Sequence, residues 1–118
     1  MLRFSLILAA GLGLGVMATS AEAASFNCAK AKSPTEKTIC GNATLSILDQ
    51  RMGAKYKVLI KLLGAGSAQA DQIRAEQVWW LSRRDSCGTD AFCVRGQIAD
   101  RIMDLDGYLA SAKKALAG

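Results

Sequence analysis

Apolar residues recur every three to four positions along three long stretches of the chain, which is the spacing that places side chains on one face of an α-helix. The stretches cover about residues 42–64, about 67–88, and a last one that starts at 89–91 and runs towards the end of the chain. The predicted inward-facing positions are Leu45, Leu48, Met52, Tyr56, Leu59 and Leu63, then Ala70, Ile73, Gln77, Trp80, Leu81 and Arg84, and finally Val94, Ile98, Ile102, Leu105, Leu109, Ala112 and Leu116.

A shorter helix is predicted ahead of these three. Ser33 is a capping residue, Pro34 suits the first helical position, and Glu36 stands three residues after the cap. These signals predict a helix from Pro34 to about Cys40 that stops at Gly41. No stretch alternates apolar and polar residues for long enough to indicate a strand. The fold class is therefore all-α, a small antiparallel helical bundle of three main helices plus a short N-terminal helix.

Gly53 interrupts the first long stretch. Glycine inside a helix costs about 1 kcal/mol relative to alanine. We therefore expect Gly53 either to let a neighbouring helix come close or to mark a bend.

The start of the chain has a different pattern. Arg3 is followed by an uncharged, mostly apolar run to Ala18, which is shorter than the roughly 20 residues that span a bilayer. Small residues at Ala21 and Ala23 then provide a cleavage site. This pattern predicts a secretory signal peptide that is cleaved after Ala23, or one residue later. An uncleaved membrane anchor is the alternative.

The predicted domain organisation follows from that cleavage. Residues 1–23 are the signal peptide, and residues 24–118 form a single domain. The residues before Cys28 do not form a lipidation box. We therefore expect a periplasmic or secreted protein that has no lipid anchor and no membrane-spanning helix in its mature part.

Four cysteines, Cys28, Cys40, Cys87 and Cys93, all lie in the predicted exported domain. An even number in a small exported domain is typical of two disulfides. Three pairings are possible, and the spacing favours the local pairs Cys28–Cys40 and Cys87–Cys93, the first of which would staple the short helix against the bundle. A zinc site of all four cysteines is the alternative, although neither pair has the two-to-four-residue separation that zinc sites favour. There is no Cys-x-x-Cys redox motif.

Composition restricts the possible chemistry. The chain contains no histidine, which excludes Ser-His-Asp and Cys-His catalytic sites and any histidine-ligated metal. Asp100 and Asp104 share a helix face, with Asp106 nearby, and paired carboxylates can act as acid and base. Arg101 interleaves with them, and we interpret the whole group as a solvated helix face. We expect no catalytic residue, no metal and no cofactor.

The net charge is +5, from 15 Lys and Arg against 10 Asp and Glu. The basic residues are spread over the chain without a focus. A positive charge of this kind attracts anionic partners. For an exported protein these would be envelope polymers rather than nucleic acid, although solubility alone also explains the charge.

Two adjacent tryptophans stand in the most distinctive segment. Neighbouring residues of a helix point about 100° apart, so both side chains cannot face the core equally. Trp80 shares the apolar face and is predicted to be buried. Trp79 shares a face with Arg83, and an exposed Trp beside an Arg is typical of protein interfaces. We take Trp79 and Arg83 as a candidate binding surface, and the alternative is that Trp79 packs under the N-terminal segment.

Arg84 lies one turn beyond Trp80, and Asp49 lies on the flank of the preceding long helix. We expect Arg84 to form a bidentate ion pair with Asp49 that ties the two helices together. Its role would be structural.

Three motifs make the chain resemble the LprI-type lysozyme inhibitor N-terminal domain, a family of small exported bacterial proteins. The segment 25–40, with its two cysteines, resembles the opening of that domain. Two interior motifs fit in order, namely Leu45, Asp49 and Tyr56, then Gln77, Trp80, Leu81, Arg84 and Asp85 followed by Cys87 and Cys93. The resemblance covers about residues 25–106.

The resemblance implies a compact helical domain with two disulfides, located in the cell envelope. It also implies a non-enzymatic protein that binds lysozyme or another envelope protein, with the motif residues acting as scaffold. The tight loop between Cys87 and Cys93 would be a rigid presenting element, because rigidity lowers the entropic cost of binding. The +5 charge would repel a basic lysozyme at long range, although the acidic residues around Asp100 offer a local counterpart. The alternative function is a cationic structural module, or one that binds peptidoglycan or lipopolysaccharide.

Overall fold

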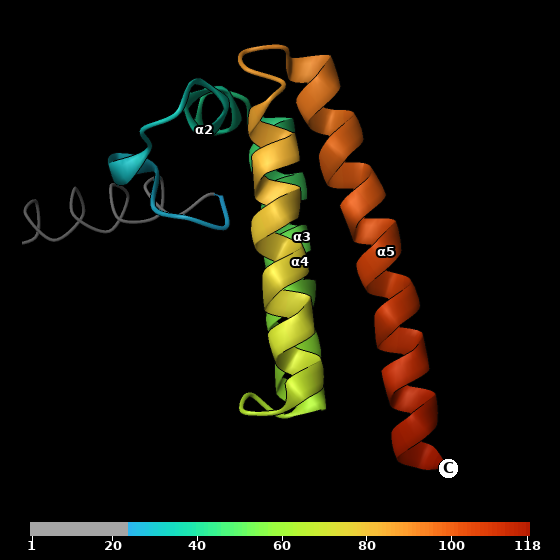
Figure 1. Ribbon diagram of the computed structural model, residues 1–118. Coiled ribbons are helices and arrows are strands. Elements are labelled where there is room, and N and C mark those ends of the chain that lie inside the picture. The colour runs from blue at the N-terminus through green and yellow to red at the C-terminus, as the bar shows by residue number, and fades with distance from the viewer. Residues whose placement is uncertain (1–23) are drawn as a thin grey trace, which may run out of the picture.

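A computed structural model describes residues 24–118, and the predicted signal peptide lies outside them (Figure 1). Three long helices lie side by side, and a short helix lies across one end of the bundle. In chain order the elements are a single 3-10 turn η1 (Cys28–Lys30) and the α-helices α2 (Pro34–Cys40), α3 (Ala43–Leu63), α4 (Ala68–Asp85) and α5 (Ala91–Ala117). Strands are absent from the described residues, so the predicted all-α bundle is confirmed.

Polar side chains cap the start of every α-helix. At α2 the Ser33 hydroxyl accepts a hydrogen bond from the Glu36 amide at 3.0 Å, and the Glu36 carboxylate accepts one from the Ser33 amide at 3.2 Å. Asn42, Ser67 and Asp90 cap α3, α4 and α5 in the same way. Because these caps satisfy amides that have no partner inside the helix, they set the helix starts locally.

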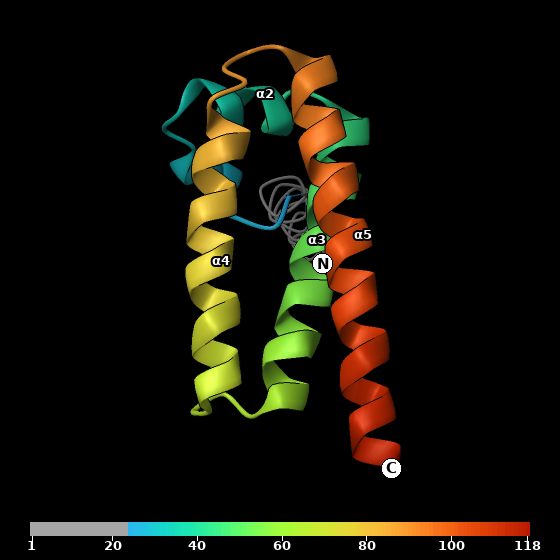
Figure 2. The same ribbon diagram turned by 45° about the vertical axis from the view of Figure 1, so that its right-hand side comes forward.

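The hydrophobic core lies between the three long helices, with α3 and α5 packed side by side along much of their length (Figure 2). Trp80 is buried as predicted, and its indole donates a hydrogen bond to the Gln97 carbonyl at 3.3 Å. The other long side chains of the core are Ile39, Leu45, Met52, Leu59, Val94, Ile98, Leu105 and Leu109. The predicted apolar faces therefore do form the core.

Leu116 is the exception, because its side chain is 67% exposed. The end of α5 extends past the ends of α3 and α4, so no helix lies opposite Leu116 (Figure 1). The apolar spacing predicted the correct face of α5 but could not indicate how far the neighbouring helices reach.

Both predicted disulfides are present. The Cα atoms of Cys28 and Cys40 are 5.8 Å apart, and those of Cys87 and Cys93 are 5.6 Å apart. The alternative of a four-cysteine zinc site is therefore wrong, and residues 24–118 contain no other cluster of metal-binding side chains. None of the helices in this range is long and apolar enough to cross a membrane.

The Cys28–Cys40 bridge joins η1 to α2 and does not reach the three long helices. Other side chains make that connection, namely Ile39, which is buried in the core and bonded through its carbonyl to Ser46 of α3, and Thr35. The Thr35 hydroxyl lies within hydrogen-bonding distance of the Asp85 carbonyl, at 3.1 Å, and of the Gly88 carbonyl, at 2.8 Å. The side chain of Thr35 is fully buried. The short helix is thus held on the bundle by the buried Thr35 hydroxyl and by Ile39 in the core, in addition to the disulfide at its end.

Gly53 is the point where the N-terminal segment crosses α3. A Cβ atom added at Gly53 would lie 2.6 Å from the Cβ atom of Ser25, closer than real Cβ contacts. The expected close approach is present, but the approaching element is residues 24–26 and not a helix.

Replacing Gly53 by alanine should therefore lower the free energy of unfolding by about 1–3 kcal/mol, the usual cost of overpacking. Gly96 is the matched control, because a Cβ atom there meets nothing within 4 Å. Gly96→Ala should raise stability by about 0.5–1 kcal/mol, since alanine favours the helix. Urea unfolding of both variants measures the difference, and equal stability gains would contradict the contact.

Candidate functional site

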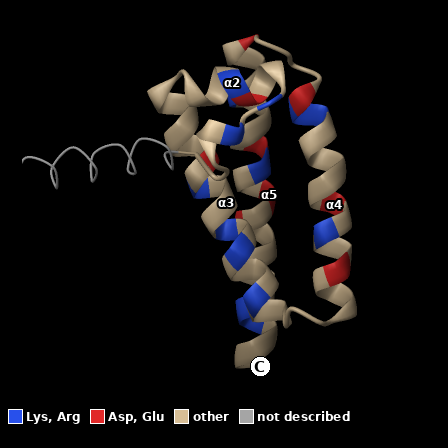
Figure 3. Ribbon diagram, turned by 90° about the vertical axis from the view of Figure 1, so that its left-hand side faces the viewer, with Lys and Arg blue, Asp and Glu red and all other residues tan. Residues whose placement is uncertain are grey.

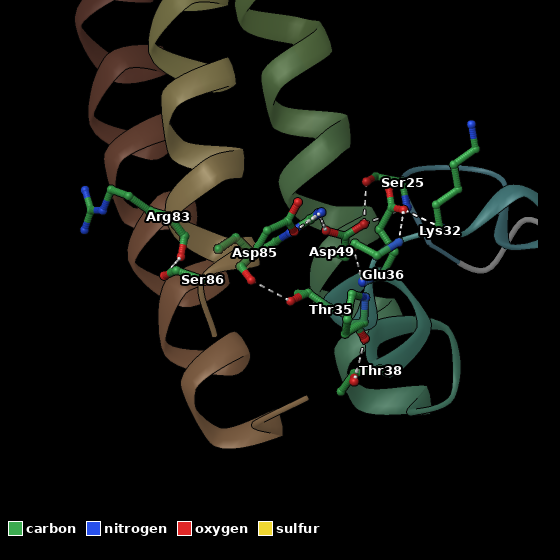
Figure 4. A network of polar contacts seen from close by, with 12 residues as sticks. Ser25, Lys32, Thr35, Glu36, Thr38, Asp49, Arg83, Asp85 and Ser86 are labelled. Atoms are coloured by element: carbon green, nitrogen blue, oxygen red, sulfur yellow. Dashed lines mark hydrogen bonds and ion pairs between the residues drawn. The ribbon is translucent and has the colours of Figure 1, made fainter. Parts of the chain in front are cut away.

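A buried polar cluster lies where residues 24–26, α2, α3 and the end of α4 meet (Figure 4). Asp49 is fully buried, and its Oδ2 atom accepts hydrogen bonds from the amide of Ser25, at 2.9 Å, and from the Ser25 hydroxyl. One terminal nitrogen of Arg84 lies 3.7 Å from Asp49 Oδ1. The ion pair between α3 and α4 therefore forms.

The expected bidentate geometry is wrong. Arg84 donates from Nε, at 3.0 Å, and from a terminal nitrogen, at 2.8 Å, to Oδ1 of the adjacent residue Asp85. Asp85 follows Arg84 directly in the last turn of α4, so its carboxylate reaches the guanidinium without crossing between helices. The ring centres of Phe26 and Trp80 each lie 5.9 Å from the guanidinium carbon, within the range of cation–π attraction.

Glu36 extends the cluster towards solvent. Its carboxylate accepts a hydrogen bond from the Lys32 amide at 2.9 Å, and this bond is the main reason that the pKa of Glu36 lies below its ordinary value. Burial is the second-largest effect and raises the pKa, whereas a second bond from Ser33 and the nearby positive charges of Arg84 and Lys32 lower it further.

The lowered pKa predicts a specific acid sensitivity. The stabilisation from Glu36 is fully present above its ordinary pKa of 4.5 and is lost as the pH falls through the lower value of the folded state. Glu36→Gln should therefore lose less stability than the parent on acidification, by about 0.5 kcal/mol after allowance for solvent screening. Urea titrations at about pH 6 and about pH 3 measure this difference. Parallel losses in both proteins would contradict it.

A cleft between α3 and α4 brings several of the motif residues, Leu81 among them, to one place. Its volume is about 550 Å³, and Phe26 of the N-terminal segment contributes to its wall. The motif residues along it are Tyr56, Gln77, Arg84 and Asp85, and the apolar ones are Phe26, Met52, Val78 and Leu81. Trp80 is not part of this lining but belongs to the core. Because most of its lining is apolar, we interpret the cleft as the place where the N-terminal segment packs against α3 and α4.

Arg101 corrects the interpretation of the acidic segment of α5. Its side chain is 2% exposed, and Nε donates to Gln77 at 2.9 Å while a terminal nitrogen donates to Glu76 at 2.6 Å. The same Glu76 oxygen accepts a bond from the Tyr108 hydroxyl at 2.9 Å, which raises the pKa of Tyr108. The sequence held a signal for this burial, because position 101 falls between Ile98 and Leu105 at helical spacing.

The acidic residues next to Arg101 do lie at the surface. Asp100 and Asp104 are exposed, as expected for a solvated face. Asp106 is also exposed and forms an ion pair with Lys55 of α3 at 2.6 Å. The three carboxylates therefore do not act as one patch, because Asp106 belongs to the α3 side of α5.

Trp79 is 61% exposed, and the Arg83 guanidinium carbon stacks 4.9 Å from its ring centre. The alternative that Trp79 packs under the N-terminal segment is wrong. That segment contacts α3 and the cleft, where Val78 rather than Trp79 forms the wall. Because successive helical side chains diverge by about 100°, Trp79 points to the outside of the bundle.

Helical spacing places two carboxylates of α5 on the flank of the bundle that also carries Trp79 of α4. The two helices are antiparallel, and the bonds of Arg101 to Glu76 and Gln77 fix their register. Helical spacing then places Asp100 and Asp104 on the same flank as Trp79. We call this surface the Trp79 face, and it consists of Glu76, Trp79, Arg83, Asp100 and Asp104. It carries an excess of negative charge on a protein of net charge +5.

A second exposed aromatic residue was not predicted. Phe92, within the loop closed by the Cys87–Cys93 disulfide, is 86% exposed. Thr35 holds the same loop through its bond to the Gly88 carbonyl. The loop is therefore anchored at both the disulfide and the buried hydroxyl, and it presents Phe92 to solvent at the α2 end of the bundle. The sequence did contain a signal for this exposure, because Phe92 lies outside the apolar stripe of the helix in which it stands.

Comparison with known proteins bears on the whole domain. The family model described as "Lysozyme inhibitor LprI" matches residues 28–115. No curated protein and no solved structure matches the chain. The family match spans both disulfides, the buried Asp49–Arg84 pair and the Trp79 face. By this match over most of its length, the chain belongs to the LprI lysozyme inhibitor family.

Proposed function

We propose that this protein is an exported, non-enzymatic inhibitor that binds lysozyme through the Trp79 face. Family membership supports the class of activity. The observation that carries the choice of surface is the 61% exposed Trp79 with Arg83 stacked on its ring. Tryptophan and arginine are the residue types that most often dominate the binding energy of protein interfaces.

The charge distribution supports a basic partner at this face. Asp100 and Asp104 are exposed on this face together with Arg83, whereas the third carboxylate, that of Glu76, is paired with the buried Arg101. Complementary local charge steers association even when both proteins carry a net charge of the same sign. The exposed carboxylates of the Trp79 face would favour a basic partner locally, in spite of the net charge of +5.

Inhibition would be steric. The helices that form the Trp79 face are held by the buried Arg101 network, and the adjoining Cys87–Cys93 loop is held by its disulfide and by Thr35. A rigid surface loses little conformational entropy on binding. Phe92 would add a second apolar contact beyond the face itself.

Binding to an anionic envelope polymer is the second candidate, and one observation favours it. Basic residues follow α3 along its length (Figure 3), where Arg51, Lys57 and Lys61 are exposed. Lys55 of the same helix is paired with Asp106, which interrupts the row. We therefore rank this function below protein binding.

The decisive experiment is a lysozyme turbidity assay with the exported protein, purified from the periplasmic fraction. Mass spectrometry of that material also tests the proposed cleavage after Ala23. Stoichiometric inhibition of a basic lysozyme supports the proposal. Salt-sensitive binding to peptidoglycan or lipopolysaccharide, without inhibition, would favour the polymer-binding function instead.

A further inference from the structure

Asp49 has one carboxylate oxygen without a donor. Its Oδ2 atom accepts both bonds from Ser25, whereas its Oδ1 atom is buried and accepts no hydrogen bond from the described residues. The nearest cationic nitrogen, Nη1 of Arg84, lies 3.7 Å away, whereas Nε and Nη2 of the same guanidinium donate to Asp85. A buried charged oxygen in this state is costly unless a further donor or charge completes it.

Several charged side chains lie near Asp49, but only Arg84 is paired with it. Three carboxylates, those of Glu36, Asp49 and Asp85, lie around Arg84, and Lys32 adds one further positive charge near Glu36. Lys57 and Arg74 also line the adjoining cleft, but among the described residues no ion pair joins either of them to these three carboxylates. Asp49 is the most deeply buried of the three carboxylates, since its side chain has no exposed surface.

We propose that the α-ammonium group created by signal-peptide cleavage pairs with Asp49 and supplies the donor that its buried Oδ1 atom lacks. Ser25 already donates its amide to the carboxylate at 2.9 Å, and Ala24 is buried at the edge of the core. Because consecutive Cα atoms are about 3.8 Å apart, the amine of residue 24 lies no more than about one residue length beyond the Ser25 amide that already bonds to Asp49. Cleavage after Ala23 would place a positive charge beside Asp49, where the uncleaved chain carries a neutral amide.

As a consequence, removal of the signal peptide would add a stabilising ion pair to the folded domain. Gly53 leaves room for residues 24–26 on α3, and Phe26 packs against the core and beside Arg84. These contacts hold the new N-terminus at the polar cluster. The inference rests on the expected cleavage and is independent of lysozyme binding.

The test uses the full chain, exported and processed in cells, with the N-terminus of each product identified by mass spectrometry. An insertion of Gly-Ser between Ala23 and Ala24 keeps the cleavage site but moves the amine two residues away. We expect this insertion to lower the melting temperature by about 4–8 °C. In the Asp49→Asn background the insertion should cause no further loss, because the charge partner is gone.

A chemical measurement keeps the proposal testable if Asp49→Asn does not fold. Mild acylation near neutral pH modifies α-amines ahead of lysines, because their pKa values are lower. The α-amine of the parent should react at least about tenfold more slowly than that of the insertion variant, since a tenfold protection corresponds to a pairing worth about 1.4 kcal/mol. Equal melting temperatures, equal acylation rates, the same loss in the Asp49→Asn background, or a product that retains its leader would each overturn the inference.

Discussion

Replacing Arg84 by methionine should lower the free energy of unfolding by about 3–5 kcal/mol, because it leaves the Asp49 carboxylate buried without its guanidinium. Asp49 and Arg84 are both almost completely buried, and they join α3 to α4. A small domain has a net stability of only about 5–15 kcal/mol, so this single change removes a large part of it. Urea unfolding followed by circular dichroism measures the loss.

Two further variants separate the buried pair from the exposed contact. Asp85→Asn removes the other partner of Arg84, but its side chain is 39% exposed, so we expect a loss of about 1 kcal/mol or less. The double variant Arg84→Met with Asp49→Leu should recover part of the stability lost by Arg84→Met alone, because no unpaired charge remains buried. A loss below about 1 kcal/mol for Arg84→Met would show that the pair is not the main connection between the helices.

Replacing Trp79 by alanine should weaken lysozyme inhibition by about 30-fold or more, the effect of an interface residue worth about 2 kcal/mol. The melting temperature should change little, because the Trp79 side chain lies outside the core. Inhibition constants from the turbidity assay measure the first effect, and thermal unfolding measures the second.

Val78 provides the matched control for Trp79. It is the adjacent residue and is also largely exposed, but it lies on the cleft side of α4. Val78→Ala should therefore leave inhibition unchanged. If Trp79→Ala inhibits as well as the parent, the Trp79 face is not the binding surface, and the loop that carries Phe92 becomes the surface to test.

Local interactions made the helices predictable. The capping box of Ser33 and Glu36 and the caps at Asn42 and Ser67 involve residues three positions apart, so the sequence contains both partners. The short separations of the cysteine pairs have the same property, and both disulfides were predicted. The family motifs also lie in the sequence, and the family match confirms the resemblance they carry.

Contacts between distant segments were harder to predict. Thr35 bonds to the carbonyls of Asp85 and Gly88, about 50 residues away, and no local pattern indicates such a partner. Gly53 signalled a close approach, yet only the folded chain shows that Ser25 is the neighbour. Leu116 continues an apolar stripe that has no helix opposite it.

The features of the candidate site also fall into two groups, those that the sequence predicts and those that depend on the folded structure. By itself the sequence determined an all-α domain, its helix starts, its disulfides and its family, because each depends on residues that are close along the chain or on the order of motifs. Only the tertiary structure decided that Trp79 faces solvent, that Arg101 is buried, and that the Asp49 carboxylate accepts hydrogen bonds from Ser25. These outcomes depend on which segments pack against a given helix face. The sequence of one helix does not specify its neighbours, and the neighbours decide which side chains are buried and which charges are paired.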